Sequence, residues 1–236
     1  MRIIIAGAGR GGLGLAAHLQ KQGHSVTVLD RDPLTANRAA EQLGVVALAG
    51  DATDVATLSQ ANPQRADVVV AMLHRDADNL AVAALSRSLG AKRMMVRMRD
   101  PLYRPVYEAA GVQQILSETE VLVGALATAI EFEVVRHSMV LGSGSIAIEL
   151  KVPADARVVG RSVSDVASDA AFPHSCVIAG IALEGAVQAP RGATVIEAGA
   201  ELLVVSARVD LARTIAMFLE SAPAVAPPAR GPLRAR

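Results

Sequence analysis

The chain has few residues that stack or crosslink. Of its 236 residues only 2% are aromatic, tryptophan is absent, and Cys176 is the only cysteine. Proteins that bind single-stranded nucleic acid use aromatic side chains as stacking platforms, so this composition argues against that class. One cysteine excludes an internal disulfide, and a reducing cytoplasm is the expected compartment.

Net charge and long apolar runs are also missing. Lys and Arg total 23, and Asp and Glu total 23, so no overall field attracts nucleic acid or an anionic membrane surface. The longest apolar run, Val121 to Ile130, is far shorter than the roughly 20 residues that cross a bilayer. The opening MRIII is too brief for a signal peptide. We expect no nucleic-acid partner and no direct membrane insertion.

The first half of the chain alternates short β-branched runs with amphipathic segments. The runs are IIIAG, SVTVLD, VVALAG, DVVVAML, RMMVRM and QQIL. Strands apolar on both faces are typical of a parallel sheet covered by helices. Helices are expected over residues 12–22, 34–43, 54–60, 77–89 and 102–110, with glycine stops at Gly23, Gly44, Gly90 and Gly111. The pattern predicts an α/β fold, a Rossmann-like doubly wound parallel sheet.

The second half predicts a small α+β domain. A long helix is expected from Glu118 to about Arg136, and the Gly/Ser pair at 142–143 suggests a boundary. The next elements are expected at 146–152 (strand), 162–168 (helix), 176–183 (strand), a turn at Glu184-Gly185 into a further strand, 201–207 (strand) and 209–219 (helix). We predict a nucleotide-binding domain with the crossover helix over 1–136, a second domain over 137–222 and a disordered Ala/Pro/Arg-rich tail over 223–236.

The loop GAGRGG is the first candidate site. Gly7, Gly9 and Gly12 match G-x-G-x-x-G between a predicted strand and a predicted helix. In that motif the first glycine makes the turn, the second admits a pyrophosphate, and the third lets the helix pack on the strand. The alternative interpretation is a tight turn without a ligand. Arg10 lies inside the loop, where a guanidinium suits a phosphate, or it simply faces solvent.

Five further positions, at the ends of the second and third predicted strands, complete the predicted cofactor site. Asp30 ends the second strand, where a carboxylate accepts hydrogen bonds from ribose hydroxyls and disfavours a 2′-phosphate, although Arg31 beside it weakens that preference. The third strand ends in GDATD, and its residues Asp51, Ala52 and Thr53 are assigned to the same site. Asp51 is expected at the adenine edge, and Thr53 is expected to cap the next helix.

A catalytic group is hard to find. Among the histidines only His74, just after the fourth strand, is expected near a cofactor, and a surface loop histidine is the simpler interpretation. Cys176 at a strand start is better explained as a core residue than as a nucleophile. The pattern favours a binding module over an enzyme. An NAD-dependent oxidoreductase that uses His74 is the alternative.

These motifs together resemble the RCK domains that regulate potassium transport, as in TrkA and KtrA proteins. The series GAGRGG, GHSVTVLDRDP, LGVVALAGDATD, ADVVVAML, DNL and RMRDP follows the amino-terminal domain of that family. The segments ELKVPADARVVGRSVSDV and APRGATVIEAGAELLVVS resemble its carboxy-terminal domain. The resemblance covers nearly the whole chain.

The resemblance implies a non-enzymatic gating-ring subunit on the cytoplasmic face of a Trk- or Ktr-type potassium translocating protein. NAD(H) or ADP/ATP would be a regulatory ligand, and dimers would assemble into a tetrameric or octameric ring in which Arg10 reaches a neighbour's nucleotide. Regulation of a cation antiporter is an alternative with the same site. Where relatives often have proline this chain has Glu118, and Glu118 or Glu120 is a candidate ligand for a divalent cation.

Overall fold

The computed structural model describes residues 1–141, 144–183 and 185–221. Contacts divide the chain into two compact units, Met1–Glu120 and the part from Val121 onward. The sequence placed the crossover helix with the first domain, whereas these contacts group nearly all of it with the second unit. Within the described ranges, the helices are too short or too polar to pass through a membrane.

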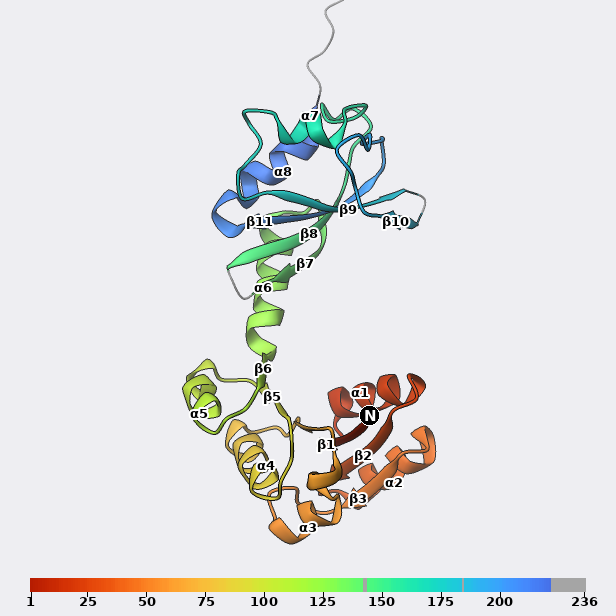
Figure 1. Cartoon of the computed structure of the whole chain (residues 1–236), viewed down its shortest axis with the longest axis vertical. Coiled ribbons are helices and arrows are strands. Elements are labelled where there is room, and N and C mark those ends of the chain that lie inside the picture. The colour runs from red at the N-terminus through yellow and green to blue at the C-terminus, as the bar shows by residue number, and fades with distance from the viewer. Residues whose placement is uncertain (142–143, 184, 222–236) are drawn as a thin grey trace, which may run out of the picture. The chain divides into compact units, whose positions relative to one another are not determined.

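The first unit is built on a parallel sheet. Its strands are β1 (Arg2–Ala6), β2 (Ser25–Asp30), β3 (Val46–Ala49), β4 (Val68–Ala71), β5 (Met94–Met98) and β6 (Gln114–Ser117), in the order β3-β2-β1-β4-β5-β6 (Figure 1). The direction of winding reverses between β1 and β4, and ligands of such sheets bind outside the carboxyl ends of the strands at this point. The six runs predicted from the sequence are confirmed as strands.

Helices connect the strands and cover the sheet. They are α1 (Arg10–Lys21), α2 (Pro33–Leu43), α3 (Val55–Gln60), α4 (Asp76–Ser88) and α5 (Arg104–Ala109), with the 3-10 turns η1 (Pro63–Arg65) and η2 (Pro101–Tyr103). One apolar cluster includes Ile5 and Val28, and another includes Leu58 and Met94. Alternate side chains of the strands reach the two clusters, which explains why the central positions of the strands are mostly apolar. The four predicted glycine stops all have positive φ.

Aspartates begin two of these helices. The side chain of Asp32 accepts the amides of Leu34 and Thr35, and the side chain of Asp54 accepts the amide of Thr57. The expectation that Thr53 caps α3 is therefore wrong. Asp54 lies one residue closer to the helix and takes the free N–H groups that a cap must satisfy.

The second unit has an antiparallel sheet. After α6 (Glu118–Glu131) come β7 (Val135–Val140), β8 (Ser145–Lys151), α7 (Val163–Ala167), β9 (Val177–Leu183), β10 (Ala186–Gln188), β11 (Glu201–Ala207), η3 (Arg208–Asp210) and α8 (Leu211–Leu219). The sheet order is β10-β9-β11-β8-β7. Ile148, Leu202 and Phe218 are among its fully buried residues, and Cys176 belongs to the same cluster. Cys176 is thus a core residue, as predicted, and burial raises the pKa of its thiol to about 11.

One expected boundary in this unit is wrong. The long helix ends at Glu131 rather than near Arg136, because Val135–Val140 pairs antiparallel with β8. The β-branched valines of VVRHSMV suit a strand better than a helix. The domain boundary predicted between residues 136 and 137 falls inside β7, whereas residues 142–143, residue Glu184 of the predicted turn and the predicted tail lie outside the described residues.

Candidate functional site

The carboxyl ends of the strands surround a cleft of about 670 Å³. Its lining includes all nine residues that the sequence assigned to a cofactor: Gly7, Gly9, Arg10, Gly12, Asp30, Arg31, Asp51, Ala52 and Thr53. Glu118 also lines the cleft, but Glu120 does not belong to its lining. The cleft lies within the first unit, at the switch point where a ligand is expected.

The three motif glycines meet different surroundings. A Cβ on Gly7 would lie 2.9 Å from the Met72 carbonyl oxygen, and φ there is +108°. A Cβ on Gly12 would overlap the Gly7 carbonyl oxygen. A Cβ on Gly9 would meet no atom within 4 Å. Packing inside the chain explains the first and third glycines, whereas Gly9 keeps open a space that a ligand group can occupy.

Asp30 joins the end of β2 to the glycine loop. Its Oδ2 accepts the Ala8 amide at 2.7 Å, and its Oδ1 accepts the Asp32 amide at 2.9 Å. Each carboxylate oxygen has a further lone pair, so both can still accept a hydroxyl group. The carboxylate therefore orients the loop and remains an acceptor at the cleft wall.

Asp51 is an exposed, ionised acceptor. Hydrogen bonds from the Thr53 hydroxyl at 2.7 Å and the Thr53 amide at 2.8 Å lower the pKa of Asp51. The positive charge of Arg31 contributes further to that lowering. Ala52 between them is buried. Thr53 thus fixes the rotamer of Asp51 and holds it charged at the edge of the cleft.

Arg10 is exposed at the first position of α1. Across residues 1–141, 144–183 and 185–221, it forms no salt bridge with a carboxylate. Its guanidinium stands beside the amino terminus of α1, where the helix dipole also favours an anion. Arg10 and the helix dipole thus supply positive charge at the loop end of the cleft, beside the Asp30 carboxylate.

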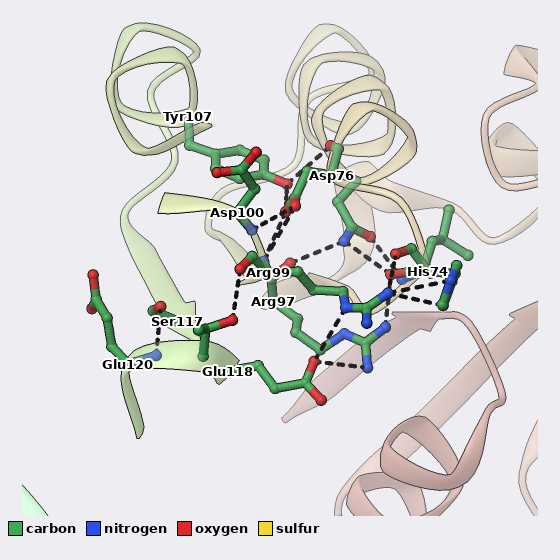
Figure 2. Close-up of polar contacts among 12 residues, drawn as sticks. His74, Asp76, Arg97, Arg99, Asp100, Tyr107, Ser117, Glu118 and Glu120 are labelled. Atoms are coloured by element: carbon green, nitrogen blue, oxygen red, sulfur yellow. Dashed lines mark hydrogen bonds and ion pairs between the residues drawn. The ribbon is translucent and has the colours of Figure 1, made fainter. Parts of the chain in front are cut away.

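Arg97 lines the opposite end of the cleft, and Arg99, which is outside the cleft lining, contacts the same glutamate, Glu118 (Figure 2). Nη2 of Arg97 donates to the Leu73 carbonyl at 2.9 Å, and its Nη1 lies 3.3 Å from Oε2 of Glu118. The same carboxylate oxygen lies 3.9 Å from Nε of Arg99, whose Nη1 is 3.2 Å from both ring nitrogens of His74. Neither arginine was predicted to belong to the site. Their position in RMRDP, at the end of a predicted strand, is the signal that marks them.

Buried polar side chains fix this end of the cleft. Asn79 is fully buried; its Oδ1 accepts the Leu73 amide at 2.7 Å, and its Nδ2 donates to the Arg97 carbonyl at 3.0 Å. The Asp76 carboxylate accepts the Arg99 amide, the Asp100 amide and the Tyr107 hydroxyl. Burial, with Asp76 nearby, raises the pKa of Tyr107 far above its usual value. These contacts tie α4 to the ends of β4 and β5.

The residues proposed for a divalent cation are paired with arginines. Glu118 faces Arg97, and both oxygens of Glu120 accept from Nη2 of Arg104, at 2.8 and 3.0 Å. In the part of the chain that the structure describes, no group of three His, Cys, Asp or Glu side chains is placed to hold a metal ion. Oxygen-rich coordination is what such cations require, so this donor set does not fit one within a single chain.

These features define a class of protein. A doubly wound parallel sheet with a glycine-rich loop and an acid at the end of β2, followed by a small antiparallel domain, is a Rossmann-type domain joined to a second unit. Family models described as the TrkA-N domain and the TrkA-C domain match residues 3–118 and 147–219. The chain belongs to the TrkA family.

Curated relatives support that membership. A Trk system potassium uptake protein TrkA homolog of Methanothermobacter thermautotrophicus is 30% identical over 204 residues, covering 86% of this chain and 93% of the relative. A protein of the same name in Archaeoglobus fulgidus is 32% identical over 216 residues, which cover 89% of this chain and 48% of the relative. The chain thus spans nearly all of one relative and about half of the other.

Solved structures match in fold. The GsuK channel bound to NAD aligns with a TM-score of 0.65 and 20% identity, over 94% of this chain and 40% of that chain. The isolated GsuK RCK domain gives a TM-score of 0.63 at 19% identity. At this identity the match concerns the fold, and it confirms the predicted architecture of a Rossmann-like sheet followed by a small α+β domain.

Proposed function

We propose that this protein is a nucleotide-sensing regulatory subunit of a Trk- or Ktr-type potassium uptake system. The observation that carries the proposal is the open space beside Gly9 in a cleft that also contains Asp30. The names of the curated relatives, which are potassium uptake proteins, support the transport system. They favour it over a cation antiporter, which would use the same cleft.

The proposed ligand is the adenosine diphosphate part of NAD(H) or ADP/ATP. Asp30 would accept the ribose hydroxyls, and Asp51 and Ala52 would lie along the adenine. The amides at the start of α1 would bind the phosphates, with Arg10 reaching a phosphate of its own or of a neighbouring subunit's nucleotide. The size of the cleft, about 670 Å³, falls in the range of ligand sites, and a GsuK structure contains NAD.

The proposed mechanism is linkage between ligand and assembly. A nucleotide that binds one conformation of a ring better than another shifts the population toward it, and a coupled pore follows. About 5.5 kcal/mol of differential binding converts a mostly closed population into a mostly open one. We propose that the ring forms from dimers on the cytoplasmic face of an integral membrane partner.

Catalysis is not part of this proposal. Hydride transfer would need an acid or base beside the cofactor, and among the described histidines only His74 lines the cleft. Its ring is 3.2 Å from the Arg99 guanidinium. An oxidoreductase would reduce bound NAD in the presence of a metabolite, and incubation with candidate metabolites while absorbance is followed at the NADH band tests that alternative.

The nucleotide affinity of the Gly9→Val variant tests whether the cleft is the binding site. Val Cβ and its methyl groups would fill the space beside the loop, so we expect about a hundredfold weaker binding of ADP and NAD by titration calorimetry, equal to about 2.8 kcal/mol. Gly14→Val is the matched control, because a Cβ on Gly14 also meets no atom within 4 Å and Gly14 lies outside the cleft lining. Unchanged affinity in Gly9→Val would overturn the site assignment.

The Asp30→Ala variant is a second test of the site, and it is expected to lower the stability of the protein as well. It should weaken nucleotide binding, but it also removes the acceptor of two amides, so we expect about 1–3 kcal/mol lower stability. Potassium flux through the co-purified membrane partner, measured with ATP, ADP, NAD and NADH, then tests the regulatory step. Flux that is the same with all four nucleotides contradicts it.

A further inference from the structure

Arg97 carries a charge that the surrounding chain only partly satisfies. Its side chain is 23% exposed, and its Nε is buried without a hydrogen-bond partner. A sheltered guanidinium needs a counter-charge to offset its desolvation. In the described ranges the carboxylate that pairs with it is Glu118, which is 47% exposed and lines the same cleft.

Glu118 is held loosely. Its distances to Arg97 and Arg99 are 3.3 and 3.9 Å, longer than the 2.7–2.9 Å typical of charge-assisted hydrogen bonds. Two residues later, Glu120 has the tight geometry, with both oxygens within 3.0 Å of Arg104. One carboxylate shared by two guanidiniums cannot neutralise both of them, and Asp78, which lines the same cleft, lies 3.9 Å from Arg75 rather than on Arg97. The Arg97 guanidinium can therefore still attract an anion.

The position of this cluster suits the distal end of a ligand. Asp30 follows β2 and Arg97 belongs to β5, which is three strands away in the order β2-β1-β4-β5. Neighbouring strands are about 4.8 Å apart, so the two sites are about 14 Å apart along the sheet edge. The glycine loop lies between them, after β1. A nucleotide with its ribose at Asp30 and its phosphates at the loop would direct its last phosphate toward Arg97.

We propose that Glu118 is a specificity-determining internal counter-ion, which the anionic end of a bound nucleotide displaces from Arg97 and Arg99. This inference rests on the proposed nucleotide site. A ligand with several negative charges at its distal end repays the loss of the Glu118 contact, whereas a ligand that ends at its first phosphate leaves Glu118 in place. Glu118 thereby makes the affinity for a nucleotide depend on the length of its phosphate chain. Glu118 is also the first residue of α6.

If Glu118 bound a divalent cation, its removal would change the affinity for ATP in the opposite direction. If Glu118 were a metal ligand, its removal would weaken binding of ATP, and only when Mg²⁺ is present. If it is a counter-ion, its removal strengthens binding of ATP without Mg²⁺, because the competitor for the arginines is gone. The sign of one affinity change therefore separates the two roles.

The experiment compares Glu118→Gln with wild type by calorimetry, using AMP, ADP and ATP in EDTA. We expect about tenfold tighter binding of ATP, equal to about 1.4 kcal/mol, and a gain that falls toward AMP. Glu120→Gln is the matched control, since it breaks an ion pair on the same helix outside the cleft lining. Its affinities should equal those of wild type. Thermal unfolding confirms that both variants fold, and Glu118→Ala repeats the test if Gln disturbs the helix start.

Several outcomes overturn the counter-ion role. ATP affinity unchanged in Glu118→Gln, an equal gain for AMP and ATP, or weaker ATP binding confined to Mg²⁺ would each do so. In those cases wild-type binding that remains sensitive to Gly9→Val leaves the proposed function standing. Absence of nucleotide binding by the wild type would remove both proposals.

Discussion

At the scale of single residues, Gly12 is required for packing inside the chain, whereas Gly9 borders the open space of the cleft. Gly12→Ala would place a methyl group against the Gly7 carbonyl oxygen, where α1 meets β1. We expect about 1–3 kcal/mol lower stability in urea denaturation, because neither backbone segment can move freely. Gly9→Ala should stay within about 0.5 kcal/mol of wild type, since its methyl group enters open space. Equal losses in the two variants would contradict this division.

Single residues also show how far the sequence could predict the site. Gly7, Gly9, Gly12 and Asp30 line one cleft, and the sequence could group them because a turn, a close approach and a strand end fix their spacing. The pairing of Arg97 with Glu118 depends on β5 lying beside β6, which no local pattern states. One error is local: Thr53 was expected to cap α3, but its hydroxyl donates a hydrogen bond to Asp51.

At the scale of elements, aspartates make three helix starts sensitive to acid. Hydrogen bonds from Thr35, Thr57 and Ser162 lower the pKa of Asp32, Asp54 and Asp165 below the usual value of about 3.9. A lowered folded-state pKa stabilises the protein above the unfolded value, and that contribution is lost as the pH falls through the folded value. We therefore expect stability to decline below about pH 4.

Asp54→Asn tests one of these caps. The neutral amide still offers an oxygen to the Thr57 amide, so the variant keeps the cap and loses the charge. The melting temperature of the wild type should exceed that of the variant at pH 7, and the difference should shrink as the pH falls below about 4. A difference that is constant from pH 7 to pH 3 would exclude the carboxylate charge as its source.

Elements were predicted best where burial is greatest. Strand β4 is apolar and buried throughout, and β1 is buried after Arg2, because helices cover both faces of the sheet there. Glycines with positive φ mark the helix ends. The segment after α6 was mistaken for helix because exposed residues of β7 give its pattern no clear period. Its pairing with β8, made through distant residues, decides its conformation.

At the scale of the whole molecule, α6 has an apolar face that nothing in the described chain covers. Gly124 and Thr128 are buried, and a Cβ on Gly124 would contact Val140 of β7. Leu122, Leu126 and Ile130 are 56%, 53% and 82% exposed. Their spacing of four residues places them along one stripe. Such a stripe supports the proposed assembly into dimers and rings.

Leu126→Glu combined with Ile130→Glu tests that assembly. The wild type should elute as an oligomer in size-exclusion chromatography with light scattering, and the double variant should shift to a smaller species. Leu34→Glu is the control, because Leu34 is a similarly exposed apolar residue, 67% accessible, on α2. A wild type that is monomeric at tens of micromolar, or a double variant with unchanged mass, would contradict the assembly.

The side chains of Asn79 and Asp76 have a consequence for the whole domain. They accept hydrogen bonds from the backbone amides of Leu73, Arg99 and Asp100, which lie in loops and would otherwise bond to solvent. Peptide groups bonded in this way exchange their protons only when the surrounding structure opens. We therefore expect the amides of Leu73, Arg99 and Asp100 to exchange slowly, and the backbone at the rim of the cleft to be positioned before a ligand binds.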